Sequence, residues 1–282
     1  AVEARAFELR RWRRPVEIVL WALSFVVLVL PFTALLLTSL VPAVGVPLNA
    51  ASATLENYRF VLFEHAAARR AFGNSFGLSA AAAVTIVLIA VPLAYFLVWR
   101  RSRLLRAVNV VTEVPYAVPG VVLAIAAILL FLKPLPVVGF SLYNTIWIIL
   151  FCYLARFLVL GLRPIVSGYH QLDRTLEEAA QIVGARLIRR LATIILPLVA
   201  PAAAAGALLI FLTAFNELTV SALLWSTGAE TLGVVFFSFQ QGGDSNYAAA
   251  LGMLTVIVSI VLMLSTLLLA GRLPKGVLPW RD

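Results

Sequence analysis

The sequence has 282 residues, of which 62% are hydrophobic and 12% charged, and its net charge is +9. Soluble domains carry about 25% charged residues, so this composition excludes an ordinary soluble domain and indicates lipid as the main solvent. The positive charges lie in short clusters between apolar runs, which is typical of membrane proteins and argues against a nucleic-acid partner. A single cysteine, Cys152, and two distant histidines, His65 and His170, exclude a disulfide framework and a cysteine or histidine metal cluster.

Six apolar runs follow one another along the chain, each long enough for a helix across the hydrocarbon core, which takes about 20 residues. A helix satisfies every backbone polar group of such a run, and the alternation typical of a membrane barrel is absent from the sequence. No cleavable signal pattern is evident, and the chain opens with Ala1 instead of methionine, which favours a trimmed product or part of a longer protein. We predict an all-α polytopic membrane protein with six transmembrane helices, at about 18–40, 72–99, 114–132, 142–162, 191–224 and 247–270.

The distribution of Lys and Arg predicts the orientation of these helices. Most of them lie before the first run, after the second, between the fourth and fifth, and after the sixth. The positive-inside rule places these segments and both termini in the cytoplasm. We therefore expect a multi-pass protein of the bacterial plasma (inner) membrane, with a cytoplasmic segment at 1–15, a transmembrane domain at 16–272 and a cytoplasmic tail at 273–282.

The outer loop at 225–247 contains an apolar stretch, LGVVFFSF, that is too short to span a bilayer. We expect a re-entrant or interfacial helix there. A simple loop packed on the last transmembrane helix is the alternative.

The longest cytoplasmic connection carries a charged stretch at 174–190. Asp173 or Thr175 is suited to cap a helix, glutamates occupy its first turn, and arginines near its far end complement the helix dipole. Gly184 interrupts the pattern and indicates a bend, or a place where another backbone comes close. An amphipathic helix lying on anionic lipid is the alternative interpretation.

The spacing within this stretch is specific. Glu-Ala-Ala is followed after three residues by Gly, after nine more by Ile, and after one more by Leu-Pro. This pattern resembles the EAA loop of ABC importer permeases of the maltose-transporter-like, type I class. At about one in ten to one in twenty per position, average residue usage makes a chance match over the whole pattern very improbable. The matching positions are Glu178, Ala179, Ala180, Gly184, Ile194, Leu196 and Pro197.

Further segments extend the resemblance over nearly the whole chain, with a shared permease core at about 70–270: ENYRFVLFE, RAFGNSFGLSAAAAV, VPYAVPGVVLAIA and TAFNELTVSALL. The resemblance implies that the EAA loop forms a short cytoplasmic coupling helix that docks on a dimer of ATP-binding subunits. It also implies a second permease half and a periplasmic or extracellular substrate-binding protein as partners. The chain has no GxxxxGK[ST] phosphate loop. We therefore expect a transport permease, not an enzyme, with no cofactor of its own and with ATP and Mg bound by the partner ATPase.

Three segments resemble ferric-iron permeases, in particular the second half of fused two-half proteins. They are GLRPIVSGYHQLDRTLEEAAQ, NELTVSALLWSTGAETLGVVFFSFQQGG and LPKGVLPW. This implies that the permease moves ferric iron into the cytoplasm by alternating access. Permeases for 2-aminoethylphosphonate, polyamines, thiamine or sulfate share such phrases and are the alternatives.

Polar residues inside the apolar runs are candidates for the translocation path or its gate, because ionisable groups in a membrane usually face a cavity or a partner. Glu217 fits the preference of hard cations for oxygen ligands and is a weak candidate metal ligand, while a structural or gating role is the simpler interpretation. The Asn-Glu pair also resembles sugar permeases. Arg156 is expected to pair with a carboxylate or with backbone carbonyls, and no firm metal site is predicted. The full set of path or gate candidates is Glu113, Tyr153, Arg156, Asn216 and Glu217.

Other classes of function have less support. An ion-gradient-driven secondary transporter often shows inverted repeats, and no internal repeat is evident in the sequence. A membrane enzyme needs a cluster of catalytic side chains within the spans, and the sequence indicates none.

Overall fold

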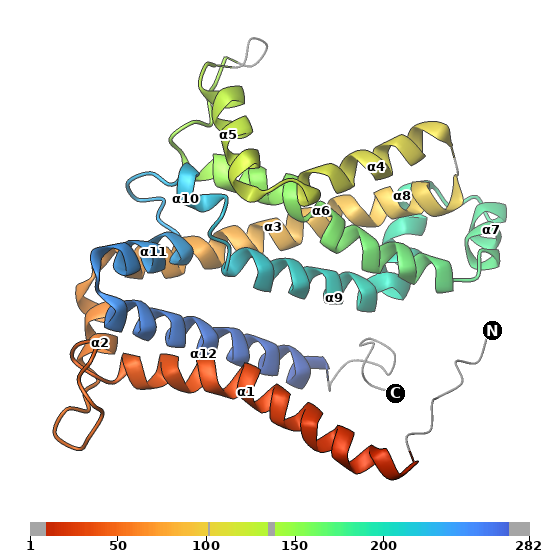
Figure 1. The fold of residues 1–282 in the computed structure, drawn as a ribbon. Helices are drawn as coiled ribbons and strands as arrows, with labels where there is room; N and C mark the ends of the chain where they lie inside the picture. The colour runs from red at the N-terminus through yellow and green to blue at the C-terminus, as the bar shows by residue number, and fades with distance from the viewer. Residues whose placement is uncertain (1–9, 101, 135–138, 271–282) are drawn as a thin grey trace.

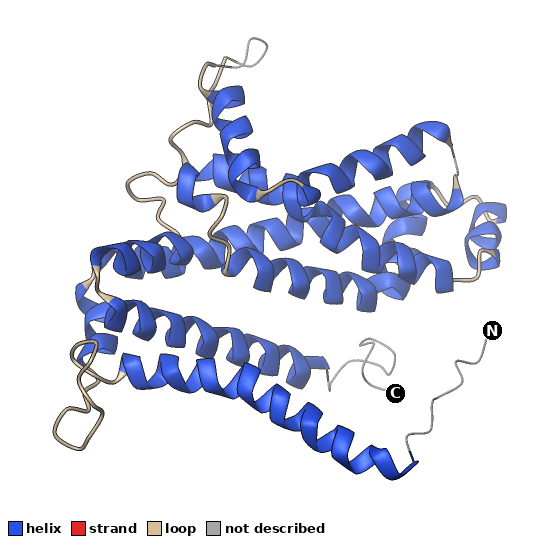
Figure 2. Ribbon diagram, in the orientation of Figure 1, coloured by secondary structure: helices blue, strands red, loops and turns tan. Residues whose placement is uncertain are grey.

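The computed structural model describes residues 10–100, 102–134 and 139–270. The described residues form helices and loops without a strand (Figure 2), which confirms the all-α class. Residues 1–9 of the predicted N-terminal segment and the whole predicted tail at 273–282 lie outside the described residues. In chain order the elements are the 3-10 turn η1 (Arg10–Trp12), α1 (Arg13–Ser39), α2 (Glu56–Arg59), the π-helical turn η2 (Phe60–Glu64), α3 (Ala66–Trp99), α4 (Arg103–Ala117), α5 (Gly120–Phe131), α6 (Ile146–Gln171), α7 (Thr175–Ile182), α8 (Leu187–Arg190), the π-helical turn η3 (Leu191–Ile195), α9 (Leu196–Phe215), α10 (Ser221–Leu224), α11 (Leu232–Gly242) and α12 (Ser245–Ala270).

Five segments of the described chain are long and apolar enough to cross a membrane: α1, α3, α6, the continuous segment from α8 to the end of α9, and α12. The bent pair α4 and α5 makes a sixth if it counts as one span. These segments confirm a polytopic membrane protein. They overlap the predicted runs, but α3 begins six residues before the predicted 72 and α6 extends nine residues past the predicted 162, and two further differences are described below.

The centre of the molecule is made by α3, α6 and α9, which pack on one another (Figure 1). Their shared core contains Ile86, Ile149 and Ile210. Two glycines let α6 and α9 approach closely, since a Cβ added to Gly206 would lie only 3.2 Å from the Cα of Gly161. Small residues at such contacts are the usual means by which helices pack in lipid, because the hydrophobic effect does not hold them together there.

The first helix, α1, packs along α12 and not into the centre (Figure 1). Polar contacts tie their ends together: the Asn57 amide donates to the carbonyls of Ser39 and Val41, at 2.9 and 2.8 Å, and the Asn246 amide donates to Asn57 Oδ1 at 2.9 Å. Ser39 is the one buried residue of α1. Most other side chains of α1 are exposed on the faces that do not pack against α12.

The predicted span at 114–132 is broken into two helices near its start. Helix α4 ends at Ala117, α5 begins at Gly120, and the two are bent by 108°. Pro119 has no backbone N–H and keeps the preceding residue, Val118, extended with ψ at 136°. Pro115 is accommodated inside α4, so only the second proline breaks the helix.

The prediction for the fifth span is wrong at its C-terminal end. Helix α9 stops at Phe215, residues 216–220 are irregular, and α10 is a separate short helix. At the other end the helix is longer than predicted, because α8 continues through η3 into α9. The π-helical turn lies just before Pro197, which has no N–H to donate to the preceding turn.

A helix within the segment 225–247 is confirmed. LGVVFFSF lies within α11, so the alternative of a simple loop is wrong. How deep α11 lies relative to the membrane stays a prediction.

Candidate functional site

The EAA stretch folds as two short helices and not as the single helix predicted over 174–190. Helix α7 begins at Thr175, and its N-cap residue is Arg174, which makes no side-chain cap hydrogen bond, so the predicted cap by Asp173 or Thr175 is wrong. The backbone N–H of Thr175 instead donates to Oδ1 of Asp173, the residue before the cap, at 2.9 Å. This bond lowers the pKa of Asp173. Helix α7 ends at Ile182, and α8 follows only at Leu187. The pair lies at the opposite end of the molecule from α2 and α11 (Figure 1).

Gly184 is the physical reason for the break between α7 and α8. Its φ is +76°, in the left-handed region that glycine adopts at little cost. The N–H of Gly184 donates to Gln181 and the N–H of Ala185 donates to Ala180, at 2.9 and 3.1 Å, which is the Schellman pattern of a helix end. A Cβ added to Gly184 would meet nothing within 4 Å. No close approach within the described chain therefore explains this glycine.

The motif residues differ in exposure. Glu178 and Ala179 are exposed, and Glu178 forms an ion pair with Arg174 at 3.1 Å on the surface of α7. Ala180 is buried. Further along, Ile194 is half-buried and Leu196 and Pro197 are exposed. The stretch therefore presents Glu178, Ala179 and Gly184 outward.

Apolar side chains that the sequence analysis did not single out lie around Gly184. Ile182, Val183 and Ile188 are 87%, 81% and 81% exposed. Their signal in the sequence is three aliphatic residues within a charged segment that faces water. A cluster of exposed apolar side chains rimmed by polar residues marks an interaction surface.

A buried polar contact lies behind this surface and was not predicted from the sequence. Glu177, beside the motif glutamate, is only 3% exposed. Its Oε1 accepts a hydrogen bond from the Tyr95 hydroxyl at 2.7 Å and lies 3.2 Å from Nη2 of Arg190. No local pattern predicts this contact, because Tyr95 and Glu177 are 82 residues apart in the sequence.

The predicted path residues do not form one site. Glu217 is 8% exposed, and its carboxylate accepts from the Thr219 hydroxyl at 2.6 Å and from the N–H groups of Val220 and Ser221 at 2.8 and 3.1 Å. Tyr153 lies beside Glu217. The Glu217 carboxylate thus caps the start of α10, which agrees with a structural role.

The expectation that Arg156 is paired with a carboxylate or with carbonyls is wrong for the described residues. Nη1 of Arg156 is buried and has no hydrogen-bond partner there, and Arg156 forms no ion pair with any described carboxylate. It packs against Gly120 and Thr219. The nearby carboxylate of Glu217 is already occupied by the cap of α10.

The other two candidates lie elsewhere. Glu113 of α4 pairs with Arg163 of α6 at 2.6 Å, beside a cavity of about 470 Å³ between α4, α6 and α9. Asn216 is exposed, donates to the carbonyl of Leu212 at 2.9 Å, and lines a separate cavity towards α1, α11 and α12.

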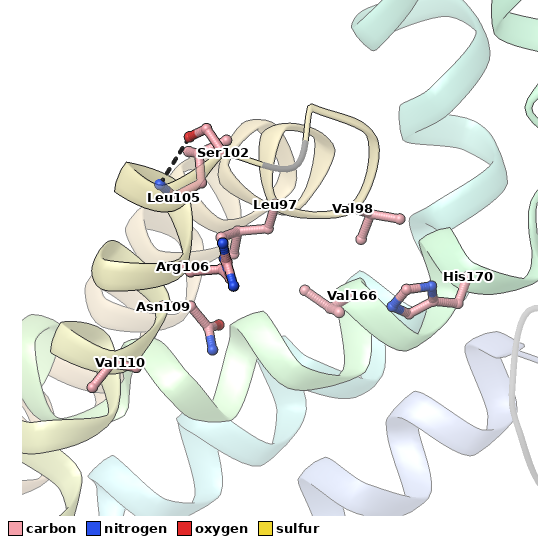
Figure 3. A pocket seen from close by; sticks show the side chains of 9 residues that line it. All are labelled: Leu97, Val98, Ser102, Leu105, Arg106, Asn109, Val110, Val166 and His170. Atoms are coloured by element: carbon pink, nitrogen blue, oxygen red, sulfur yellow. Dashed lines mark hydrogen bonds between the residues drawn. The ribbon is translucent and has the colours of Figure 1, made fainter.

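A cavity of about 660 Å³ lies between α3, α4 and α6. Figure 3 shows Arg106 and Asn109 of α4 and His170 of α6 at its polar part. The sequence analysis did not predict it. Among the described residues, no three His, Cys, Asp or Glu side chains gather in a way that would hold a metal ion.

Residues 86–278 match the family described as the inner membrane component of binding-protein-dependent transport systems. The chain belongs to this family. It is 31% identical over 281 residues to "Probable ABC transporter permease protein y4fN" of Sinorhizobium fredii, a match that covers 96% of this chain and 49% of the relative. The chain is therefore an ABC importer permease subunit and a transport protein of the inner membrane.

Relatives named for different substrates also match this inner membrane component. Over 180 residues it is 30% identical to the Fe(3+)-transport system permease protein FbpB 2 of Haemophilus influenzae, covering 64% of this chain and 34% of the relative. Over 136 residues it is 40% identical to the trehalose/maltose transport system permease protein MalG of Thermococcus litoralis, covering 47% and 48%. The chain thus spans about half or less of the length of these relatives.

A solved structure shares the fold of this permease. A bacterial ABC transporter involved in the import of the acidic polysaccharide alginate superposes with a TM-score of 0.71 at 15% identity, over 95% of this chain and 98% of that one. The arrangement of α3 to α12 is therefore the fold of an ABC permease.

Proposed function

We propose that this permease carries ferric iron from a periplasmic or extracellular binding protein into the cytoplasm by alternating access. It works with a second permease half and with a dimer of ATP-binding subunits that holds ATP and Mg. The α7–α8 segment is the docking surface for that ATPase. Both termini and this segment lie on the cytoplasmic side, because Lys and Arg gather there.

The observation that carries the docking role is the position of the EAA stretch. Helix α7 lies beyond the ends of the central helices (Figure 1), and the stretch exposes the motif residues Glu178 and Ala179 together with Ile182, Val183 and Ile188. Aliphatic side chains that are more than four-fifths exposed are costly in water, and burial against a partner relieves that cost. A helix lying on lipid remains the competing role for the same surface.

Iron is favoured over other substrates by the extent of the match. The ferric relative matches 64% of this chain, whereas MalG matches 47% at higher identity. A polyamine and a sugar are the alternatives: the spermidine/putrescine transport system permease protein PotC of Escherichia coli matches 56% of this chain at 30% identity, and MalG has the higher identity. The permease offers no group of three potential metal ligands in its described part, so we assign the selection of iron to the binding protein.

The test is uptake into proteoliposomes that contain the whole complex, with iron or maltose supplied on the matching binding protein. Iron uptake that requires ATP supports the proposal, and maltose uptake without iron uptake refutes the iron assignment. Glu178→Lys and Gly184→Asp should reduce co-purification of the ATPase and uptake while leaving membrane insertion intact. If both variants bind the ATPase like the parent protein, α7–α8 is not the docking surface.

A further inference from the structure

Helix α7 has little apolar attachment to the rest of the permease. None of its side chains belongs to the three apolar core clusters of the described residues. Only Glu177 and Ala180 are buried in it. Leu172 before α7 and Leu187 after it pack against the core, so within α7 itself the attachment to the bundle is mainly polar.

The carboxylate of Glu177 provides that contact and joins three helices. Its Oε1 accepts from Tyr95 of α3 at 2.7 Å and lies 3.2 Å from Nη2 of Arg190, the last residue of α8. Nη1 of Arg190 also donates to the carbonyl of Ala185, in the connection between α7 and α8, at 2.8 Å. The side chains of Glu177 and Arg190 are 4% and 12% exposed. We call Tyr95, Glu177 and Arg190 the junction.

Because the junction is buried, separating its members is costly. A charged hydrogen bond shielded from water is strong, and loss of one partner leaves an unpaired buried charge, which is costly. Helix α7 therefore cannot shift alone while the junction is intact. Because α8 runs through η3 into α9, a shift of α7 is passed to α9 through Arg190 and to α3 through Tyr95.

We propose that Tyr95, Glu177 and Arg190 are positioning residues that transmit movement of the ATPase-bound α7 to α3 and α9. The proposal rests on the docking role of α7–α8 proposed above. It assigns different tasks to neighbouring glutamates: the exposed Glu178 belongs to the docking surface, and the buried Glu177 passes the movement inward.

The test compares hydrogen exchange of the purified complex without nucleotide and with ATP and vanadate, a probe that needs no transported substrate. In the parent complex, the nucleotide should change exchange in α7, α3 and α9. In Tyr95→Phe and Glu177→Gln, the change should stay in α7 and fall at least about fivefold in α3 and α9, the lower end of usual coupling between sites. The ATPase should still co-purify at the parental ratio.

Tyr169→Phe is the matched control. It also removes a buried hydroxyl, which donates to the carbonyl of Val91 on α3 at 2.9 Å, and among the described residues Tyr169 makes no hydrogen bond or ion pair with α7. Its exchange pattern should match that of the parent. Arg190→Lys, which keeps the cation, should retain more of the response than Arg190→Gln.

Parental exchange changes in Tyr95→Phe and Glu177→Gln would overturn the junction. So would an equal loss in Tyr169→Phe, which would show a general loss of stability, or a loss of ATPase binding in Tyr95→Phe. Failure of the docking role is distinguishable from these results, because Gly184→Asp and Glu178→Lys would then bind the ATPase normally.

Discussion

Gly161 of α6 and Gly206 of α9 face each other so closely that a Cβ on Gly206 would lie 3.2 Å from the Cα and 3.3 Å from the carbonyl oxygen of Gly161. The atoms that a side chain on Gly206 would meet belong to the backbone of α6, so they cannot move aside by changing rotamer. The contact fixes the distance between two of the three central helices.

The first prediction concerns this contact. Gly206→Val should lower the free energy of unfolding by about 1–3 kcal/mol or more, because extra volume at a tight contact forces helices apart. Gly77→Ala is the control: Gly77 lies inside α3, a Cβ there meets nothing within 4 Å, and alanine should gain up to about 1 kcal/mol. Thermal unfolding in detergent measures both. Equal melting temperatures for Gly206→Val and the parent would contradict the contact.

The second prediction separates two roles of Gly184. If its left-handed φ of +76° is what matters, Gly184→Asn should be milder than Gly184→Ala, because asparagine tolerates this conformation and alanine pays about 1 kcal/mol or more. If contact with the ATPase matters as well, Gly184→Asn should also weaken ATPase binding. Co-purification of the ATPase and circular dichroism of the permease measure the two effects separately. If Gly184→Ala matches the parent protein in both ATPase binding and circular dichroism, neither the left-handed conformation nor contact with the ATPase explains this glycine.

The third prediction concerns Arg156. Because its buried Nη1 has no described partner, Arg156→Met should have a melting temperature equal to or above that of the parent, since an apolar side chain has no unpaired charge to bury. The control is Arg163→Met, which leaves Glu113 without its partner at 2.6 Å and should cost up to about 1 kcal/mol. A larger loss for Arg156→Met than for Arg163→Met would reveal a partner of Arg156 outside the described residues.

The fourth prediction concerns the outer loop before α11. Arg70 of α3 donates to Glu230 Oε1 at 3.1 Å, and this hydrogen bond lowers the pKa of Glu230 below its ordinary value of 4.5. Since the folded pKa is the lower one, the stabilisation is present above pH 4.5 and is lost as the pH falls through the folded value. A spin label at Thr227, with Cys152→Ser to leave one thiol, should become more mobile at acid pH.

Arg70→Gln is the companion variant for this loop. It should make the same label mobile already at neutral pH and should remove most of the pH response. A label whose mobility is the same at both pH values in the parent would show that Glu230 does not hold the loop.

The sequence predicted the membrane class and the EAA stretch because both are local signals. An uninterrupted apolar run leaves a helix as its only stable form in lipid, and the EAA spacing is read within one segment. The breaks were harder to place. Two prolines precede α5, and sequence alone does not say that Pro119 ends a helix while Pro115 is accommodated. The junction could not be predicted from the sequence, because Tyr95 contacts Glu177 only once the fold has brought α3 and α7 together.

Glu217 shows a different limit of sequence reasoning. Its place in an apolar run indicated a residue that faces a cavity or a partner, and the structure places it 8% exposed. Its partners are the backbone N–H groups of Val220 and Ser221. They become available as donors only because α9 ends and α10 begins there, and that break was not predicted.

The sharp bend between α4 and α5 separates two rigid helices that can rotate relative to each other. Helix α5, with 12 residues, is about 18 Å long. Val118 and Pro119 connect the two helices, and the backbone hydrogen bonds on either side of them stay within one helix or the other. The N–H of Val118 donates to the carbonyl of Val114, and the N–H of Val122 donates to the carbonyl of Pro119. Rotation at the bend therefore breaks no backbone hydrogen bond. A turn of about 10° sweeps the far end of α5 through about 3 Å, roughly the width of a water molecule.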